Sequence, residues 1–194
     1  MKQHERRTRA LRRLQLGLER YYGLERAPDV AMFVEDGAES EREKLLVRET
    51  EDALELKLVL PSAAPPVGAN DEFLQLVEGV SHFVYLVERA RTGLPTTQLE
   101  LELQAEVDKF VMLGLGARNA DRRARLELHT MLYERVEFLH PESSEQGQRY
   151  RMANELAARF TVKLLDIDAR SARHLLQRFY RAGQSDKIRL ARAA

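Results

Sequence analysis

Two pairs of ionisable residues at helical spacing are the strongest candidates for chemistry in this sequence. Glu78 and His82 lie four residues apart, as do Glu102 and Glu106, so each pair shares one face of a helix. Carboxylates and an imidazole in this arrangement can bind a divalent metal ion, and a bound ion can activate water for hydrolysis. These four residues therefore form a candidate metal site for a hydrolase or a small-ligand binding protein.

The same side chains also suit a structural role. In an antiparallel pair of helices, His82 lies level with Glu106, whereas Glu78 lies about one helical turn beyond His82. The spacing also differs from the Glu-x-x-His motif of carboxylate-bridged di-iron bundles. A hydrogen bond from His82 to Glu106, with Tyr85 reaching Glu102, would instead satisfy partly buried polar groups. A metal site, a polar network, an acidic ligand pocket and full exposure remain the alternatives.

Arginines and a histidine share a face of a later predicted helix, where Arg122 and Arg125 precede His129. An arginine followed by a histidine five to seven residues later resembles the motif of HEPN-type ribonucleases, and the resemblance covers only residues 122–129. It implies that Arg122 and His129 act as a pair on an RNA phosphate, in a fold that is helical throughout. Ion pairing along the helix surface is the alternative interpretation.

Several catalytic classes are excluded by residues or motifs that the sequence lacks. There is no cysteine, which excludes thiolate nucleophiles, cysteine-ligated zinc and iron–sulfur clusters. There is also no glycine-rich phosphate loop, no Gly-x-Ser-x-Gly motif and no His-Glu-x-x-His motif. The sequence therefore favours a binding protein over an enzyme, and it predicts no cofactor unless the metal site exists.

Basic residues gather at both ends of a chain whose 31 basic and 31 acidic residues balance. Residues 1–20 carry seven basic and two acidic side chains, and residues 170–194 carry seven basic and one acidic. Such segments predict an interaction or adaptor module that binds an acidic protein surface or nucleic acid. Zero net charge and the lack of aromatic residues among the basic ones favour a protein partner. The arginines expected to form this basic patch are Arg6, Arg9, Arg13, Arg173, Arg178 and Arg181.

The distribution of apolar residues bears on location. No apolar run has the length of a signal-peptide core, and eighteen consecutive apolar residues occur nowhere. We therefore expect a soluble cytoplasmic protein that does not contact a membrane.

A helical hairpin is predicted to position the Glu78 and Glu102 pairs. Residues 71–91 place apolar side chains at steps of three and four, and Gly93 and Pro95 end that helix. Thr97 and Glu100 form a capping-box pattern at the start of the second helix. The apolar residues of the first stripe are Phe73, Leu76, Val77, Val80, Val84 and Val87.

Between residues 30 and 61 the apolar period changes to that of strands. Leu54, Leu56, Leu58 and Leu60 alternate with Glu55, Lys57 and Val59, which predicts a strand with the leucines on one buried face. Shorter runs at 30–35 and 45–50 precede it, and the polar join at 50–53 predicts a hairpin between the last two runs. We expect a three-stranded antiparallel meander, with a helix as the competing prediction for the leucine-rich run.

The remaining segments predict further helices around the hairpin. Residues 6–22 form a basic amphipathic helix, and residues 121–139 predict a helix with Leu128, Leu132, Val136 and Leu139 inward. Ser143-Ser144-Glu145-Gln146 is a second capping-box pattern that starts another helix. Asp168 can cap a final helix, and Gly183 ends it before a basic tail at 184–194. The predicted fold is α+β: a small antiparallel β-meander (30–61) on a helical bundle of about five to six helices (70–183), preceded by helix 1–23, all in one domain spanning 1–194.

Overall fold

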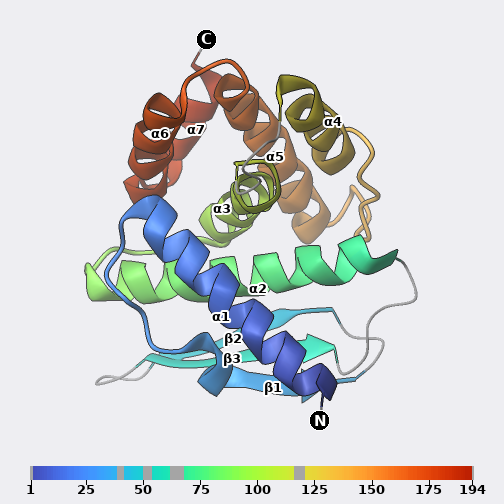
Figure 1. Cartoon of the computed structure of the whole chain (residues 1–194), viewed down its shortest axis with the longest axis vertical. Helices are drawn as coiled ribbons and strands as arrows, with labels where there is room; N and C mark the ends of the chain where they lie inside the picture. The colour runs from blue at the N-terminus through green and yellow to red at the C-terminus, as the bar shows by residue number, and fades with distance from the viewer. Residues whose placement is uncertain (1, 39–41, 50–53, 62–67, 116–120, 194) are drawn as a thin grey trace. The chain divides into compact units, whose positions relative to one another are not determined.

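The computed structural model describes residues 2–38, 42–49, 54–61, 68–115 and 121–193. Within these ranges the chain forms seven α-helices and one three-stranded sheet, which confirms the predicted α+β class (Figure 1). The chain divides into two compact units, each described here by itself. Unit 1 comprises Met1–Arg20 and Leu24–Pro95, and unit 2 comprises Tyr21–Gly23 and Thr96–Ala194. The expectation that residues 1–194 form a single domain stays a prediction.

Unit 1 holds the sheet and the helices that cover it. The strands are short, and a single turn of 3-10 helix leads into the first of them. The elements are α1 (Lys2–Tyr22, of which the last two residues belong to unit 2), η1 (Val30–Phe33), β1 (Val34–Gly37), β2 (Lys44–Glu49), β3 (Leu54–Pro61) and α2 (Gly68–Arg91).

The sheet is mixed, so the prediction of an antiparallel meander was wrong. Its strand order is β1-β3-β2, and β1 runs parallel to β3, with Val34 opposite Leu58. The predicted strand at 30–35 begins instead as η1, because the Asp29 side chain caps the Ala31 amide and turns the chain. Only at Val34 does the backbone extend, and there it meets β3, the strand with the most apolar face.

The hairpin partnership of β2 and β3 was predicted correctly. These strands pair antiparallel, with Leu45 opposite Leu58, and the join at residues 50–53 lies outside the described residues. Leu58 and Leu60 are buried while Glu55 and Lys57 are exposed, which is the alternation expected for a sheet with one covered face.

Helices α1 and α2 bury their apolar stripes within unit 1. Figure 1 shows α2 lying alongside the sheet, roughly in the direction of its strands, and the helix contacts β2 and β3. On α1, Leu11, Leu14 and Leu18 are buried, as the amphipathic pattern predicts. Arg7 also donates hydrogen bonds to the Pro61 carbonyl and the Asp36 carboxylate, so this helix is tied to the ends of β1 and β3.

Unit 2 is helical throughout its described part. It contains α3 (Gln98–Phe110), the π-helical turn η2 (Val111–Leu115), α4 (Arg122–Tyr133), α5 (Glu145–Thr161), η3 (Val162–Leu164), α6 (Ala169–Arg181) and α7 (Gln184–Arg192). Three predicted helix starts are confirmed by their caps. Thr97 and Glu100 form the expected capping box, and Asp121 and Asp168 accept backbone hydrogen bonds at helix starts. The helix predicted to start with a capping box at 143–146 instead has a single cap, in which the Ser144 hydroxyl accepts from the Gly147 amide.

Two segments of unit 2 differ from prediction. Helix α4 ends at Tyr133 because the amides of Glu134 and Arg135 both bond to the Thr130 carbonyl, and the predicted inward residues Val136 and Leu139 are exposed. The expected basic tail after Gly183 forms helix α7. Its buried residues include a lysine and an alanine one turn apart, and these carry no apolar periodicity in the sequence.

Candidate functional sites

Helix α6 separates an apolar face from a basic one. The Asp168 side chain starts this helix by accepting hydrogen bonds from the amides of Arg170 and Ser171. A hydrogen bond from the Ser171 hydroxyl, and then those from the amides, hold the pKa of the Asp168 carboxyl below its usual value. Ala172, Leu176, Phe179 and Tyr180 are buried in unit 2. The polar face is therefore left to the solvent, where it carries the arginines that the sequence singled out.

A cavity of ≈ 440 Å³ lies between the exposed side of α6 and the helix that follows it. Three arginines and a histidine line it, and only one lining residue is acidic. The lining residues are His174, Gln177, Arg178, Arg181, Ala182, Asp186, Arg189 and Leu190.

The charges of the cavity are only partly balanced. Arg189 bonds to Asp186 at 2.8 Å, three residues earlier on α7. Among the described residues, Arg178 and Arg181 form no ion pair, and both are exposed. Two guanidinium groups on one wall thus keep their donors available, and guanidinium groups bind carboxylates and phosphates in a planar, two-point geometry.

Helix α7 is held in place by a buried polar chain that sequence reasoning missed. Lys187 is fully buried; its Nζ donates to Gln104 Oε1 at 2.5 Å and lies 4.3 Å from the ring centre of Phe179. Gln104 donates in turn to Asp108 at 2.9 Å, and Asp108 also accepts from the Tyr22 hydroxyl. More than 80 residues separate Tyr22 and Lys187 from this part of α3, so no sequence spacing could reveal the chain.

Two tyrosines of unit 2 are held in their neutral form. Burial is the main cause that raises the pKa of the Tyr22 phenol well above its usual value, and the neighbouring Asp108 charge adds to it. Burial likewise raises the pKa of Tyr133, with a further contribution from the Glu106 carboxylate. The Tyr133 hydroxyl donates to the Glu106 backbone carbonyl at 2.9 Å, so both phenols act as hydrogen-bond donors.

The predicted basic patch is divided between the two units. Arg6, Arg9 and Arg13 are exposed along α1 in unit 1. Arg173, Arg178 and Arg181 lie on α6 in unit 2, and the last two of these line the cavity. Sequence reasoning missed His174, although it lies on the same helix as Arg178 and Arg181. It missed Arg189 because that residue belongs to the next helix, α7.

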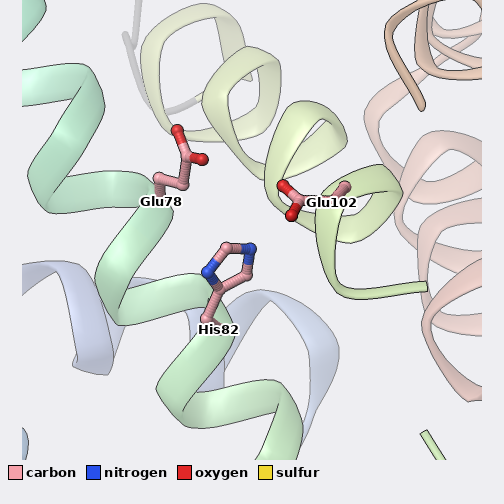
Figure 2. Close-up of side chains that lie close together, drawn as sticks. All are labelled: Glu78, His82 and Glu102. Atoms are coloured by element: carbon pink, nitrogen blue, oxygen red, sulfur yellow. The ribbon is translucent and has the colours of Figure 1, made fainter. Parts of the chain in front are cut away.

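Glu78 and His82 share one face of α2, as predicted. Figure 2 shows this pair of side chains on the same helix. The atoms that could bind a metal, a His82 ring nitrogen and a Glu78 carboxylate oxygen, lie within 4.8 Å of each other. Glu102, also labelled in Figure 2, lies on α3 in unit 2 and is largely buried. Glu106 bonds to Lys109 at 2.8 Å. The four-residue metal site draws on both units and stays a prediction, as does the polar network.

Arg122 and His129 each have a partner of their own within unit 2. Arg122 is exposed and its Nε lies 2.5 Å from Asp166. His129 is largely buried, with its Nε2 3.0 Å from the Ala158 carbonyl and its ring edge-on to Tyr133. These contacts are of the kind that stabilise helix packing. The ribonuclease role of this pair stays a prediction.

Comparison with protein-family models, with curated proteins and with solved structures finds no match to this chain. Among the described helices, none combines the length and the apolar character that are needed to cross a membrane.

Proposed function

We propose that this chain is a non-catalytic interaction module of the cytoplasm that binds an acidic segment of a partner protein. The binding site is the basic cavity between α6 and α7. The observation that carries this proposal is the presence of Arg178 and Arg181 on one wall of the cavity, without an ion pair among the described residues. Exposed arginines that converge on a cavity give both attraction and orientation to an anionic group.

A protein partner suits the cavity better than nucleic acid. Sites for single-stranded nucleic acid combine basic groups with aromatic side chains on which bases stack. No phenylalanine, tyrosine or tryptophan lines this cavity, and the imidazole of His174 is its one aromatic ring. Because a single imidazole is a small platform for successive bases, a carboxylate-bearing or otherwise acidic peptide is the better match for the arginines.

The proposal is tested by removing the two arginines that carry it. We expect the double variant Arg178→Gln/Arg181→Gln to bind a fluorescent acidic peptide library at least about tenfold more weakly than the wild type, since two charge-assisted hydrogen-bond donors are lost. Fluorescence anisotropy at two salt concentrations measures the affinity, and wild-type binding should weaken as salt rises.

A matched control keeps the change in net charge constant. Arg123→Gln/Arg159→Gln also removes two exposed arginines of unit 2, but these pair with Glu127 and Glu155 outside the cavity. The control should bind as the wild type does. Equal loss in both double variants would contradict the proposal, and preferential binding of a DNA or RNA oligonucleotide would replace the protein partner with nucleic acid.

Helix α1 offers a second basic surface, formed by Arg6, Arg9 and Arg13. These side chains are exposed along one helix of unit 1 and form no ion pair among the described residues. In this proposal they add long-range attraction for the same acidic partner. Arg6→Gln/Arg9→Gln/Arg13→Gln should therefore slow association more than it speeds dissociation, as stopped-flow binding can measure.

The alternative function is a metal-dependent hydrolase or ligand-binding protein that uses Glu78, His82, Glu102 and Glu106. What favours it is the Glu78 and His82 pair, whose ligand atoms lie within 4.8 Å on one face of α2. A metal that binds only the folded chain must raise its melting temperature. The test is metal analysis of the purified protein, together with thermal melts of wild type, His82→Ala and Glu106→Ala with and without added zinc, manganese or iron(II). Stoichiometric metal in the wild type, with metal-dependent stabilisation that is lost in both variants, would support the metal-binding function.

A further inference from the structure

We propose that the anionic group recognised by the α6–α7 cavity is the phosphoryl group of a phosphorylated side chain, and that Asp186 competes with it for Arg189. This inference rests on the proposed function, because it names the ligand chemistry of the same cavity. It also assigns a role to the one acidic residue of the lining.

The spacing of the basic residues on α6 suits a compact dianion. His174, Arg178 and Arg181 follow one another at four and three residues, so they form one stripe over two turns of the helix. Arg178 and Arg181 are one turn apart, roughly 5 Å along the axis, which places two guanidinium groups within reach of a single ligand group.

Charge matching distinguishes a phosphoryl group from a carboxylate. A carboxylate carries one charge and two oxygens, and one guanidinium group engages both oxygens in the two-point geometry. A phosphorylated side chain carries close to two charges at neutral pH and three acceptor oxygens. It can therefore accept from Arg178 and Arg181 together, and it relieves the repulsion between their like charges, which a single carboxylate does only in part.

The third arginine of the cavity is already engaged by the chain itself. Arg189 Nη2 lies 2.8 Å from Asp186 Oδ1, and both side chains are more than half exposed. An exposed ion pair of this kind contributes little energy, so a ligand with more charge can displace it. Asp186 thus occupies, in the free protein, a position that a phosphoryl oxygen takes in the complex.

The experiment uses three degenerate peptide libraries whose fixed central residue is phosphoserine, glutamate or serine. Wild-type full-length chain should bind the phosphoserine library at least about tenfold more tightly than the other two. Asp186→Asn frees Arg189 and should tighten phosphoserine binding by about two- to fivefold. Arg178→Gln/Arg181→Gln should abolish the preference, whereas Arg123→Gln/Arg159→Gln should keep it. Circular-dichroism melts of every variant check that each remains folded.

The outcomes separate this inference from the proposed function. Equal binding of the glutamate and phosphoserine libraries, lost in Arg178→Gln/Arg181→Gln, would leave the acidic-partner function standing and overturn phosphoryl recognition. Binding of none of the libraries would overturn both. An Asp186→Asn variant that binds phosphoserine no better than the wild type would overturn the competitor role of Asp186.

Localisation of the phosphoryl site uses inorganic phosphate as the probe. Added to the ¹⁵N-labelled full chain, phosphate should shift the amide signals of α6 and α7 at concentrations where acetate of equal ionic strength does not. Equal shifts with the two anions, or shifts confined to other helices, would contradict a phosphoryl site in this cavity.

Discussion

Lys187 is a buried lysine whose ammonium group is held by a few specific contacts. A buried ammonium group is costly unless hydrogen-bond acceptors and charges compensate it. Here the Gln104 carbonyl oxygen accepts from it, and the face of Phe179 lies within cation–π distance. Because Lys187 is part of α7, the same contacts that compensate its charge also hold Asp186 and Arg189 at the cavity.

Replacing Lys187 with methionine should therefore destabilise the chain by about 3 kcal/mol, since removing one member of a buried polar network leaves the others uncompensated. Urea unfolding followed by circular dichroism measures the free energy of unfolding. Arg192→Met on the same helix is the control, because this side chain is exposed. A Lys187→Met variant within 0.5 kcal/mol of the wild type, about the scatter of surface substitutions, would show that the network carries no stability.

Gly79 shows how a single small residue sets the spacing of two elements. A Cβ atom added at this position of α2 would lie 2.8 Å from Cδ1 of Leu58, the fully buried leucine of β3. The helix therefore approaches the sheet as closely as glycine allows, although glycine lowers helix propensity.

Gly79→Val should destabilise unit 1 by about 2 kcal/mol through overpacking against β3. Thermal and urea unfolding measure the loss, and Leu58→Ala provides the partner for a double-mutant cycle. The combined variant should be less destabilised than the sum of the two single ones, because the smaller residue makes room for valine. Strict additivity would mean that the helix moves away instead of pressing on Leu58.

The elements also show which parts of the fold the sequence could predict. Stripes with a clear period, such as that of β3 with Leu58 and Leu60 or that of α1 with Leu11, Leu14 and Leu18, predicted both the element and its buried face. The order of the strands could not be predicted, because pairing between β1 and β3 depends on how the Asp29 cap turns the chain at Val30. Helix α7 was missed because a buried lysine reads as a surface residue.

The candidate cavity was predicted only in part, for a related reason. Arg178 and Arg181 stood out because they belong to one basic segment of the sequence. His174 lies on α6 with these arginines but was not singled out in the sequence. Asp186 and Arg189 complete the cavity only because α7 folds back beside α6, an arrangement that includes the contact of Lys187 with Gln104 of α3.

At the scale of the whole molecule, the buried phenols couple stability to pH. The folded chain holds the protons of Tyr22 and Tyr133 more tightly than the unfolded chain does, because burial raises both pKa values. Their contribution is complete below the ordinary tyrosine pKa of about 10 and is lost as the pH rises above it.

The free energy of unfolding should therefore fall between pH 10 and pH 11.5 with a slope of about 1.4 kcal/mol per pH unit for each of the two tyrosines. Urea unfolding at a series of pH values measures the slope. Tyr133→Phe should reduce the slope by about 1.4 kcal/mol per pH unit, which is the contribution of one tyrosine. A slope unchanged by this substitution would show that another group titrates in its place.

The strand order β1-β3-β2 has a consequence for synthesis of the protein. The central strand is the last of the three to leave the ribosome, so both edge strands emerge before the one segment that pairs with each of them. A ribosome that pauses when β1 and β2 have emerged but β3 is still enclosed exposes two strands that lack their common partner, and exposed strands of this kind readily pair with other chains. The speed of translation during that interval thus affects how much of the nascent protein reaches the native sheet.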